Sequence, residues 1–185
     1  MEDFSKLILP SLKKFAFVLT DPPHLTLLIL FKMELIAKKL QDEEFRSQVI
    51  PFIYTCMQSK DASISASSLK CIPSIISKLD FIMIKNTFVV TLLKSFHKDA
   101  KNDILILSTL FAIIPKLDRH TIVTDIVPIL ISPSSNIDTP EYIMTLVDIL
   151  KLISGIIEYK QTANIIIRKL WELAFDECLG VSEVF

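Results

Sequence analysis

The chain has 185 residues, of which 51% are hydrophobic and 22% charged, and its formal net charge is −1. This composition excludes a disordered chain, and the balance of 20 basic against 21 acidic residues gives no overall charge for binding nucleic acid or anionic lipid. Only two glycines are present, so phosphate-binding loops and tight hairpins are hard to build, and we predict an all-α chain.

Capping residues and prolines divide the chain into helix-sized segments. A short polar side chain can accept a hydrogen bond from the free amides of a first helical turn, and proline is tolerated at the first helical position. The predicted caps are Asp21, Asp42, Asp61, Asp99 and Asp138 or Thr139. The predicted helices span residues 4 to 19, 23 to 40, 43 to 59, 62 to 79, 82 to 97, 101 to 117, 120 to 132, 139 to 158 and 161 to 178. Ile131 to Asp138 is predicted to be a loop.

One phrase occurs twice in the chain. IISKLD (Ile75 to Asp80) returns 38 residues later as IIPKLD (Ile113 to Asp118) with five of its six letters unchanged. A nucleophile or a metal ligand is needed once, whereas stacked structural units repeat their packing residues. The recurrence therefore favours a repeat architecture over a catalytic motif.

A second register supports the same period. The phrases LILPSL, VIPFIY, VVTLLK, IVPILI and IIRKLW align on Pro10, Pro51, Thr91, Pro128 and Arg168, at spacings of 41, 40, 37 and 40 residues. The partner helices are predicted to end at Leu40, Leu79, Leu117 and Leu152. Two helices per unit and a period near 40 are typical of HEAT or armadillo arrays, and prolines recurring within the first helix favour HEAT with a bend at that position. We expect an α-solenoid of about four and a half helical pairs, forming one domain over residues 1 to 185.

Residues of catalytic type lack the spacing that catalysis needs. The three histidines, His24, His97 and His120, are far apart and none has metal-site spacing to another ligand. The serines of SASSLK have no glycine elbow, and the acidic run Asp42 to Glu44 is typical of a helix start. We therefore predict no catalytic, cofactor-binding or metal-binding residue, no small-molecule substrate and no enzyme activity.

Cysteine usage and hydropathy bear on the compartment. Cys56, Cys71 and Cys178 form no CxxC pair, which is typical of free thiols in a reducing, intracellular compartment. The most apolar uncharged stretch, Ile104 to Ile114, is far shorter than the roughly 20 residues that span a bilayer, so no transmembrane segment is predicted.

The repeated Lys-Leu-Asp ending has two interpretations. In one, its charges contact a partner; in the other, lysine offsets the negative helix end, leucine packs and aspartate caps the next helix. The second helices, at 23 to 40, 62 to 79, 101 to 117 and 139 to 158, are expected to line one face that binds protein partners. The candidate contact residues are Lys32, Lys39, Lys78, Lys116 and Lys151, with Trp171 and Phe175 near the end of the array.

Several phrases resemble a known family. Leu69 to Phe96 (LKCIPSIISKLDFIMIKNTFVVTLLKSF) and Leu110 to Leu130 (LFAIIPKLDRHTIVTDIVPIL) resemble the HEAT region of the SCY-like pseudokinases. LILPSL and Phe31 to Tyr54 are most similar to the branch associated with clathrin-coated vesicles. The resemblance covers roughly residues 7 to 130.

The resemblance implies a role in membrane traffic. Family members place a kinase-like domain before the array and a flexible tail after it, so we expect this chain to be part of a longer protein. It has no kinase glycine-rich loop, HRD-like loop or DFG-like triplet, so no catalytic residue is carried over. The expected function is a non-catalytic scaffold, cytoplasmic or at Golgi, endosome or coated-vesicle membranes, with vesicle-coat or adaptor proteins as partners. The alternative is a HEAT-repeat adaptor in nuclear or transfer-RNA transport, which would need a basic groove that the near-neutral charge does not favour.

Overall fold

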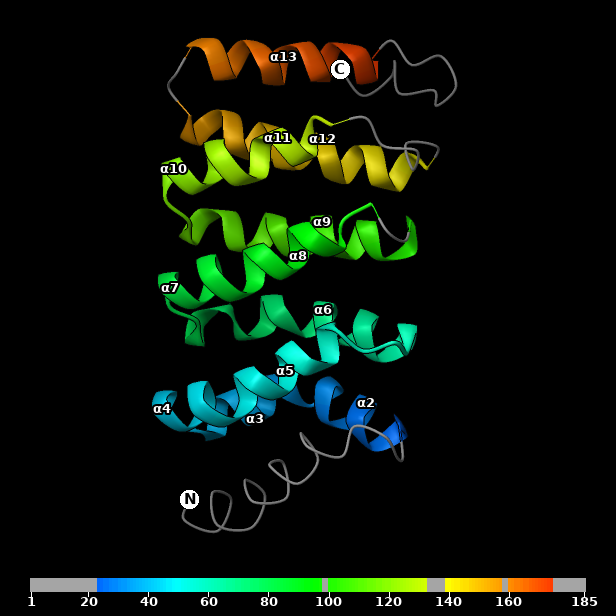
Figure 1. Ribbon diagram of the computed structural model, residues 1–185, viewed down its shortest axis with the longest axis vertical. Helices are drawn as coiled ribbons and strands as arrows, with labels where there is room; N and C mark the ends of the chain where they lie inside the picture. The colour runs from blue at the N-terminus through cyan, green and yellow to red at the C-terminus, as the bar shows by residue number, and fades with distance from the viewer. Residues whose placement is uncertain (1–22, 98–99, 133–138, 158–159, 175–185) are drawn as a thin grey trace. The chain divides into compact units, whose positions relative to one another are not determined.

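The computed structural model describes residues 23–97, 100–132, 139–157 and 160–174, and the described part of the chain is helical with no strand (Figure 1). The all-α prediction is confirmed for these residues. The predicted helix at 4 to 19 and most of the predicted loop at 131 to 138 lie outside them. The chain divides into two compact units, residues 1–83 and residues 84–185. The prediction of one repeat domain over the whole chain stays a prediction.

The first unit is built around α6 (Ala62–Ile75), which packs against α2 (Pro23–Phe31), α3 (Met33–Lys39) and α5 (Ile50–Met57) (Figure 1). The remaining helical segments are α4 (Asp42–Glu44), η1 (Phe45–Val49), η2 (Ile76–Lys78) and α7 (Phe81–Met83). Its core consists of large side chains that are almost fully buried, including Phe45, Phe52, Ile53, Ile72 and Ile75. Burial of these apolar side chains is the main stabilising contribution.

The second unit is built around α12 (Pro140–Ile156), which packs against α9 (Ala100–Ile113) and α13 (Lys160–Ala174). Shorter segments precede it: η3 (Ile84–Val89), α8 (Val90–Ser95), η4 (Ile114–Lys116), α10 (Arg119–Thr121), η5 (Ile122–Ile126) and α11 (Val127–Leu130). The α12 residues Tyr142, Ile143, Leu146, Ile149, Leu150 and Ile153 are buried, so this helix is covered on more than one side, as its wide apolar face predicts.

Several predicted helix boundaries are confirmed by their capping geometry. Asp61 is the N-cap of α6, where its carboxylate accepts hydrogen bonds from the amides of Ser63 at 2.8 Å and Ile64 at 3.3 Å. Leu40, Leu79 and Leu117 are the extended residues that end the second helices.

Three boundary predictions are wrong. Gln41 is the N-cap of α4 and Asp42 is the first helical residue, which leaves its carboxylate available for another contact. The helix predicted over 23 to 40 is interrupted at Lys32, between α2 and α3. The register end at Leu152 is also wrong, because α12 continues to Ile156, whereas the predicted helix range of 139 to 158 is confirmed within two residues.

A π-helical segment precedes three of the aligned positions of the second register, whereas Arg168 lies within the α-helix α13. The segments η1, η3 and η5 end two residues before Pro51, Thr91 and Pro128, respectively. Proline has no amide hydrogen to donate to the helical ladder, which explains the irregularity at two of these positions. Thr91 also follows a π-helical segment although it is not a proline, and its hydroxyl donates to the Thr87 carbonyl at 2.7 Å. The irregular turn at Thr91 therefore does not require proline.

Candidate interaction surface

A groove in the first unit runs between α6 and the helices α2 and α3. One wall is formed by Leu27, Leu30, Phe31 and Glu34 of α2 and α3. The other is formed by Ser67, Lys70, Cys71 and Ser74 of α6. Apart from Glu34 the first wall is apolar, and the second wall is more polar. Such a lining is typical of a site that binds a large apolar group and orients it with a few polar contacts. We call it the α2–α6 groove.

Exposed apolar side chains border the α2–α6 groove. Phe31 is 78% exposed, and Leu28 and Leu35 are 54% and 56% exposed. Positions 28, 31 and 35 follow helical spacing, although the helix is interrupted at Lys32 between the last two. Burying large apolar side chains lowers the free energy, so a group of them beside a groove marks a candidate contact surface.

The first-unit lysines predicted as contacts have different surroundings. Lys32 is exposed beside the groove, with its Nζ 5.0 Å from the centroid of the Phe31 ring, and Lys39 is exposed at the end of α3. Lys78 is half-buried and makes internal contacts, with an ion pair to Asp42 and a hydrogen bond to the Leu40 carbonyl at 3.4 Å. Lys78 therefore stabilises the end of α3 and the start of α4.

The other candidate residues belong to the second unit. Lys116 on η4 and Lys151 on α12 are exposed, and Trp171 on α13 is 59% exposed with Ile167 one turn before it. Phe175 lies outside the described residues. Of the predicted contact residues, Lys32 lies beside a residue that lines the α2–α6 groove, namely Phe31.

The two copies of the Lys-Leu-Asp ending make matching contacts. In the first unit, one Asp80 oxygen accepts the Met83 amide at 2.8 Å, and the other lies 3.1 Å from the Arg46 guanidinium. Leu79 and Leu117 are buried behind the two endings. The cap predicted for Asp80 is confirmed, and Arg46 is an additional partner that the sequence pattern did not identify.

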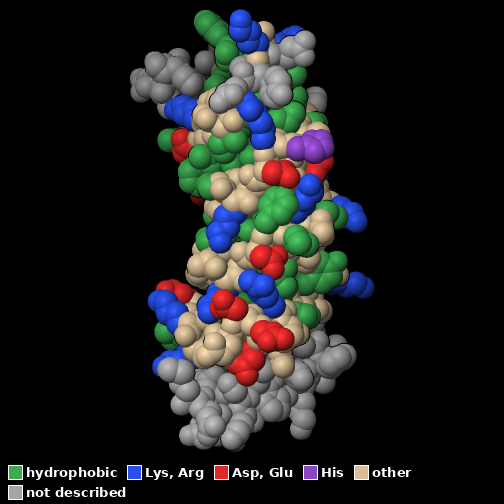
Figure 2. All heavy atoms as spheres, turned by 90° about the vertical axis from the view of Figure 1, so that its left-hand side faces the viewer, with side chains coloured by type: hydrophobic (Ala, Val, Ile, Leu, Met, Phe, Trp, Pro, Cys, Tyr) green, Lys and Arg blue, Asp and Glu red, His purple; other side chains and the backbone are tan. Residues whose placement is uncertain are grey.

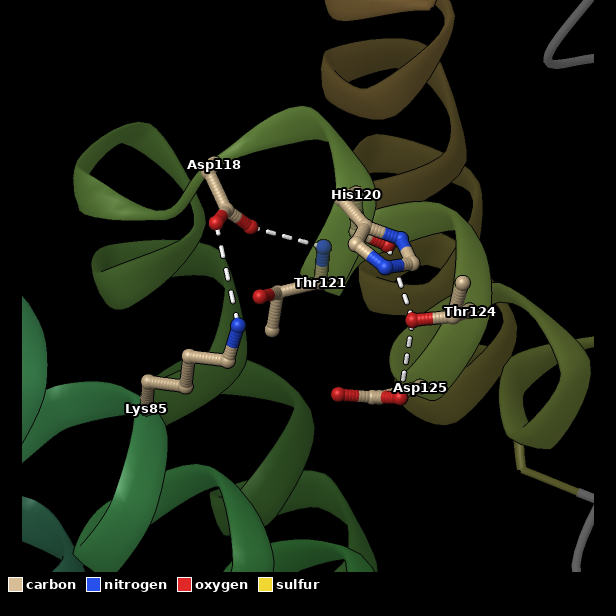
Figure 3. A network of polar contacts seen from close by, with 6 residues as sticks. All are labelled: Lys85, Asp118, His120, Thr121, Thr124 and Asp125. Carbon is tan, nitrogen blue, oxygen red and sulfur yellow. Dashed lines mark hydrogen bonds and ion pairs between the residues drawn. The ribbon is translucent and has the colours of Figure 1, made fainter.

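The second copy repeats this arrangement in the other unit. One Asp118 oxygen accepts the Thr121 amide at 2.7 Å and the other lies 3.7 Å from Lys85 Nζ (Figure 3). The Thr121 hydroxyl and amide beside Asp118, with smaller contributions from the charges of Lys85 and His120, lower the pKa of its carboxyl group. Arg46 lies in η1 and Lys85 in η3, so the basic partners also hold equivalent places.

His97 brings three residue types of nucleophilic catalysis together in the second unit. Its Nε2 lies 3.3 Å from Ser132 Oγ and its Nδ1 3.7 Å from a carboxylate oxygen of the buried Asp103. The Ser132 hydroxyl donates its proton to the Ile129 carbonyl at 2.6 Å, so it is not aligned for transfer to the imidazole.

The backbone gives this cluster a structural explanation. His97 has a φ of 65° just after α8, a position where a left-handed residue ends a helix, and its amide donates to Asp103 at 2.9 Å. Asp103 thereby joins the end of α8 to the first turn of α9. The cluster is a helix-ending contact in this geometry.

Charges of both signs lie next to one another on the face in Figure 2, where Lys and Arg side chains alternate with Asp and Glu over the described residues. Within the described ranges, no group of histidine, cysteine and acidic side chains is arranged to hold a metal ion. Among the described helices, none is both long enough and apolar enough to cross a bilayer.

The chain is similar to a protein kinase domain-containing protein and to SCY1-like protein 2. It is 25% identical over 166 residues to protein kinase domain-containing protein ppk32 of Schizosaccharomyces pombe, a match that takes in 88% of this chain and 22% of ppk32. It is 27% identical over 131 residues to SCY1-like protein 2 of Homo sapiens and of Mus musculus, in each case 70% of this chain and 14% of the relative. No model of a protein family matches the chain.

These similarities support a relation to the SCY1-like family, as the sequence resemblance predicts. The chain spans between about a seventh and about a fifth of the length of these relatives. Any activity of such a whole protein therefore depends on much sequence beyond the part that matches here.

Proposed function

We propose that the chain is an array of HEAT, or armadillo-like, repeats that serves as a non-catalytic scaffold within a SCY1-like pseudokinase. In this role it binds protein partners, among them vesicle-coat or adaptor components, and supports clathrin-dependent or related vesicle traffic. The protein acts in the cytoplasm and at Golgi, endosome or coated-vesicle membranes, which it reaches through its partners.

The repeated contact of Asp80 and Asp118 carries the proposal. Each caps the helix that follows it and pairs with a base in the π-helical segment of the preceding first helix. Such recurrence at one period is expected when each helical pair packs on the next, as in a repeat array. Together with the similarity to SCY1-like protein 2, it favours a repeat scaffold over a single compact enzyme domain.

The exposed side chains support a binding role. Phe31 borders the α2–α6 groove in the first unit, and Trp171 is exposed on α13 in the second. Aromatic side chains of this kind dominate the energy of protein interfaces because they bury much apolar area with little loss of conformational freedom.

A replacement experiment in cells tests the function. The full-length protein that contains this chain is compared with a version in which residues 23–174 are replaced by a flexible linker, at equal expression. We expect the replacement to reduce both the uptake of a clathrin-dependent cargo and the recovery of the protein in isolated coated vesicles. Unchanged uptake and recovery would contradict the proposal.

The transport alternative gives a different result in vitro. Binding of transfer RNA to the purified chain is measured by gel shift at low and at physiological salt. We expect weak binding without a steep salt dependence, because the net charge is −1 and basic and acidic side chains alternate on the face shown in Figure 2. Tight binding that falls steeply with salt would favour the transport adaptor.

A further inference from the structure

The α2–α6 groove combines an open apolar wall with a hollow that a side chain can enter. Phe31 lines the groove and is also its most exposed apolar residue, so one face of its ring is available to a partner. Leu27 and Leu30 lie on the same wall, and Leu30 is buried. A large apolar group placed here would leave water on several sides, which is the geometry of an interface hot spot.

Lysines lie on both sides of the groove. Two charged side chains line it, Glu34 on the first wall and Lys70 on the second. Lys32 is a second lysine, with its Nζ 5.0 Å from the ring of the lining residue Phe31. Glu34 is bound by Lys38 at 2.6 Å, and this hydrogen bond, with the charge of Lys38, lowers the pKa of the Glu34 carboxyl group. Lys70 is exposed on the second wall and Lys32 is exposed next to Phe31. Because Glu34 is paired with Lys38, these two lysines are the charges that can attract an acidic group.

We infer that the α2–α6 groove docks a short acidic segment of a partner protein, with one large apolar side chain against Phe31 and flanking carboxylates near Lys32 and Lys70. The inference rests on the proposed scaffold function, since it names the surface and the chemistry of one partner. Charge complementarity selects an acidic segment and excludes a basic one, because like charges across a small interface are destabilising.

A membrane surface fits this site less well than a peptide. Anionic lipid would also attract the lysines, but a bilayer presents a broad surface, whereas the groove is a hollow with serines on its second wall. Ser67 and Ser74 line the second wall. The Ser74 hydroxyl donates to the Cys71 carbonyl at 2.7 Å, so its oxygen can accept a hydrogen bond from a segment that enters the groove.

Selection from a random peptide library displayed on phage tests the inference with the purified chain. Expected binders carry a large apolar residue flanked by Asp or Glu, and their affinity is measured with synthetic peptides by fluorescence anisotropy. Phe31→Ala and Lys70→Glu are each expected to weaken binding at least about tenfold, the effect of losing an interface hot spot. Phe31 and Lys70 are exposed, so both variants should keep the wild-type melting curve.

Two matched substitutions serve as controls. Phe111→Ala removes another exposed phenylalanine, on α9, and Lys94→Glu reverses another exposed lysine, on α8. Both are expected to bind the selected peptides with wild-type affinity. Selected peptides that are basic or neutral, or that bind Phe31→Ala and Lys70→Glu as well as wild type, would overturn the inference.

Two further measurements separate this inference from its rivals. The first is sedimentation with vesicles of phosphatidylcholine and phosphatidylserine in equal amounts, which should leave the chain in solution. If the wild-type chain binds the vesicles and Phe31→Ala does not, the surface is a lipid site and the peptide proposal is overturned.

The second measurement is made in cells, where Phe31→Ala is expected to lower cargo uptake. If that variant behaves as wild type while replacement of residues 23–174 abolishes uptake, the groove inference fails and the scaffold function stands.

Discussion

Asp80 and Asp118 lie 38 residues apart, and each uses one carboxylate oxygen to cap the next helix and the other to pair with a base. The two contacts differ in energetic weight. An N-cap contributes about 1 kcal/mol to stability, whereas a half-exposed ion pair contributes about 0.2–1 kcal/mol and is screened by salt. The cap is therefore the larger of the two contributions that each aspartate makes to stability.

Substitutions at Asp118 and Lys85 separate these contributions. Asp118→Ala loses both contacts and is expected to lower the free energy of unfolding by about 1–2 kcal/mol. Asp118→Asn keeps a side-chain acceptor for the Thr121 amide, and Lys85→Met keeps the cap entirely, so each should cost less than about 1 kcal/mol. Urea unfolding followed by circular dichroism measures all three. An Asn variant as unstable as the Ala variant would show that the charge, and not the cap, is dominant.

The contact between Lys78 and Asp42 is one source of pH-dependent stability in the first unit. The hydrogen bond from Lys78, followed by its positive charge, lowers the pKa of Asp42 below its ordinary value of 3.8. Since the folded-state pKa is the lower one, the stabilisation is complete above the unfolded value and is lost as the pH falls through the folded value.

Lys78→Met should remove this dependence. We expect the variant to have a lower urea midpoint at pH 6, and to lose less stability than wild type between pH 5 and pH 2. The matched control is Lys39→Met, at an exposed lysine of α3, which should follow the wild-type pH profile. Parallel acid-side profiles for wild type and Lys78→Met would rule out a role for this pair.

The sequence predicted the number and order of the described helical stretches because long apolar runs, few glycines and recurring caps act locally. Asp61 and the endings at Leu40, Leu79 and Leu117 illustrate this, since each depends on residues within about one turn. The error at Leu152 has the same origin. Without a Lys-Leu-Asp phrase the repeat register misplaced the helix end, whereas the local apolar pattern placed it within two residues of Ile156.

The groove could not be predicted for a different reason. Phe31 and Leu30 are adjacent apolar residues in one run, yet Leu30 is 2% exposed and Phe31 78% exposed, because α6 covers only one side of α2. Only the position of a neighbouring helix distinguishes them. The one available signal was Lys32, whose charge within the apolar run marks the side of the helix that faces water.

The π-helical segment before Thr91 predicts that proline is tolerated there. Its counterparts Pro51 and Pro128 hold the same place after a π-helical segment, so the backbone at Thr91 should accept the fixed φ and missing amide hydrogen of proline. Thr91→Pro is expected to lower the free energy of unfolding by less than about 1.5 kcal/mol, chiefly through loss of the hydroxyl contact with Thr87.

Proline at an ordinary helical position of α8 provides the comparison. Lys94 is exposed, so Lys94→Pro changes the backbone without removing core packing, and it should cost about 3 kcal/mol. Thermal and urea unfolding of both variants compare the two losses of stability. Equal losses at the two positions would mean that the irregular turn does not accommodate proline at Thr91.

The reactivity of two buried thiols measures whether the first unit is folded. Burial raises the pKa of Cys56 and of Cys71 to about 12, and both side chains are nearly inaccessible, although Cys71 lines the α2–α6 groove. At pH 8 only about one thiol in ten thousand would be ionised, and the thiolate is the reactive form. We expect neither cysteine to react with a disulfide reagent in the folded protein.

The measurement uses a Cys178→Ser variant, so that only these two thiols are counted. Reaction with Ellman's reagent at pH 8 is followed along a urea titration, with circular dichroism of the same samples. Two thiols should become reactive together, at the urea concentration where the first unit unfolds, because Cys56 on α5 and Cys71 on α6 belong to one packed core. Reaction of Cys71 alone without urea would instead mean that the groove opens down to the α6 backbone in the folded state, and that its floor is available to a partner.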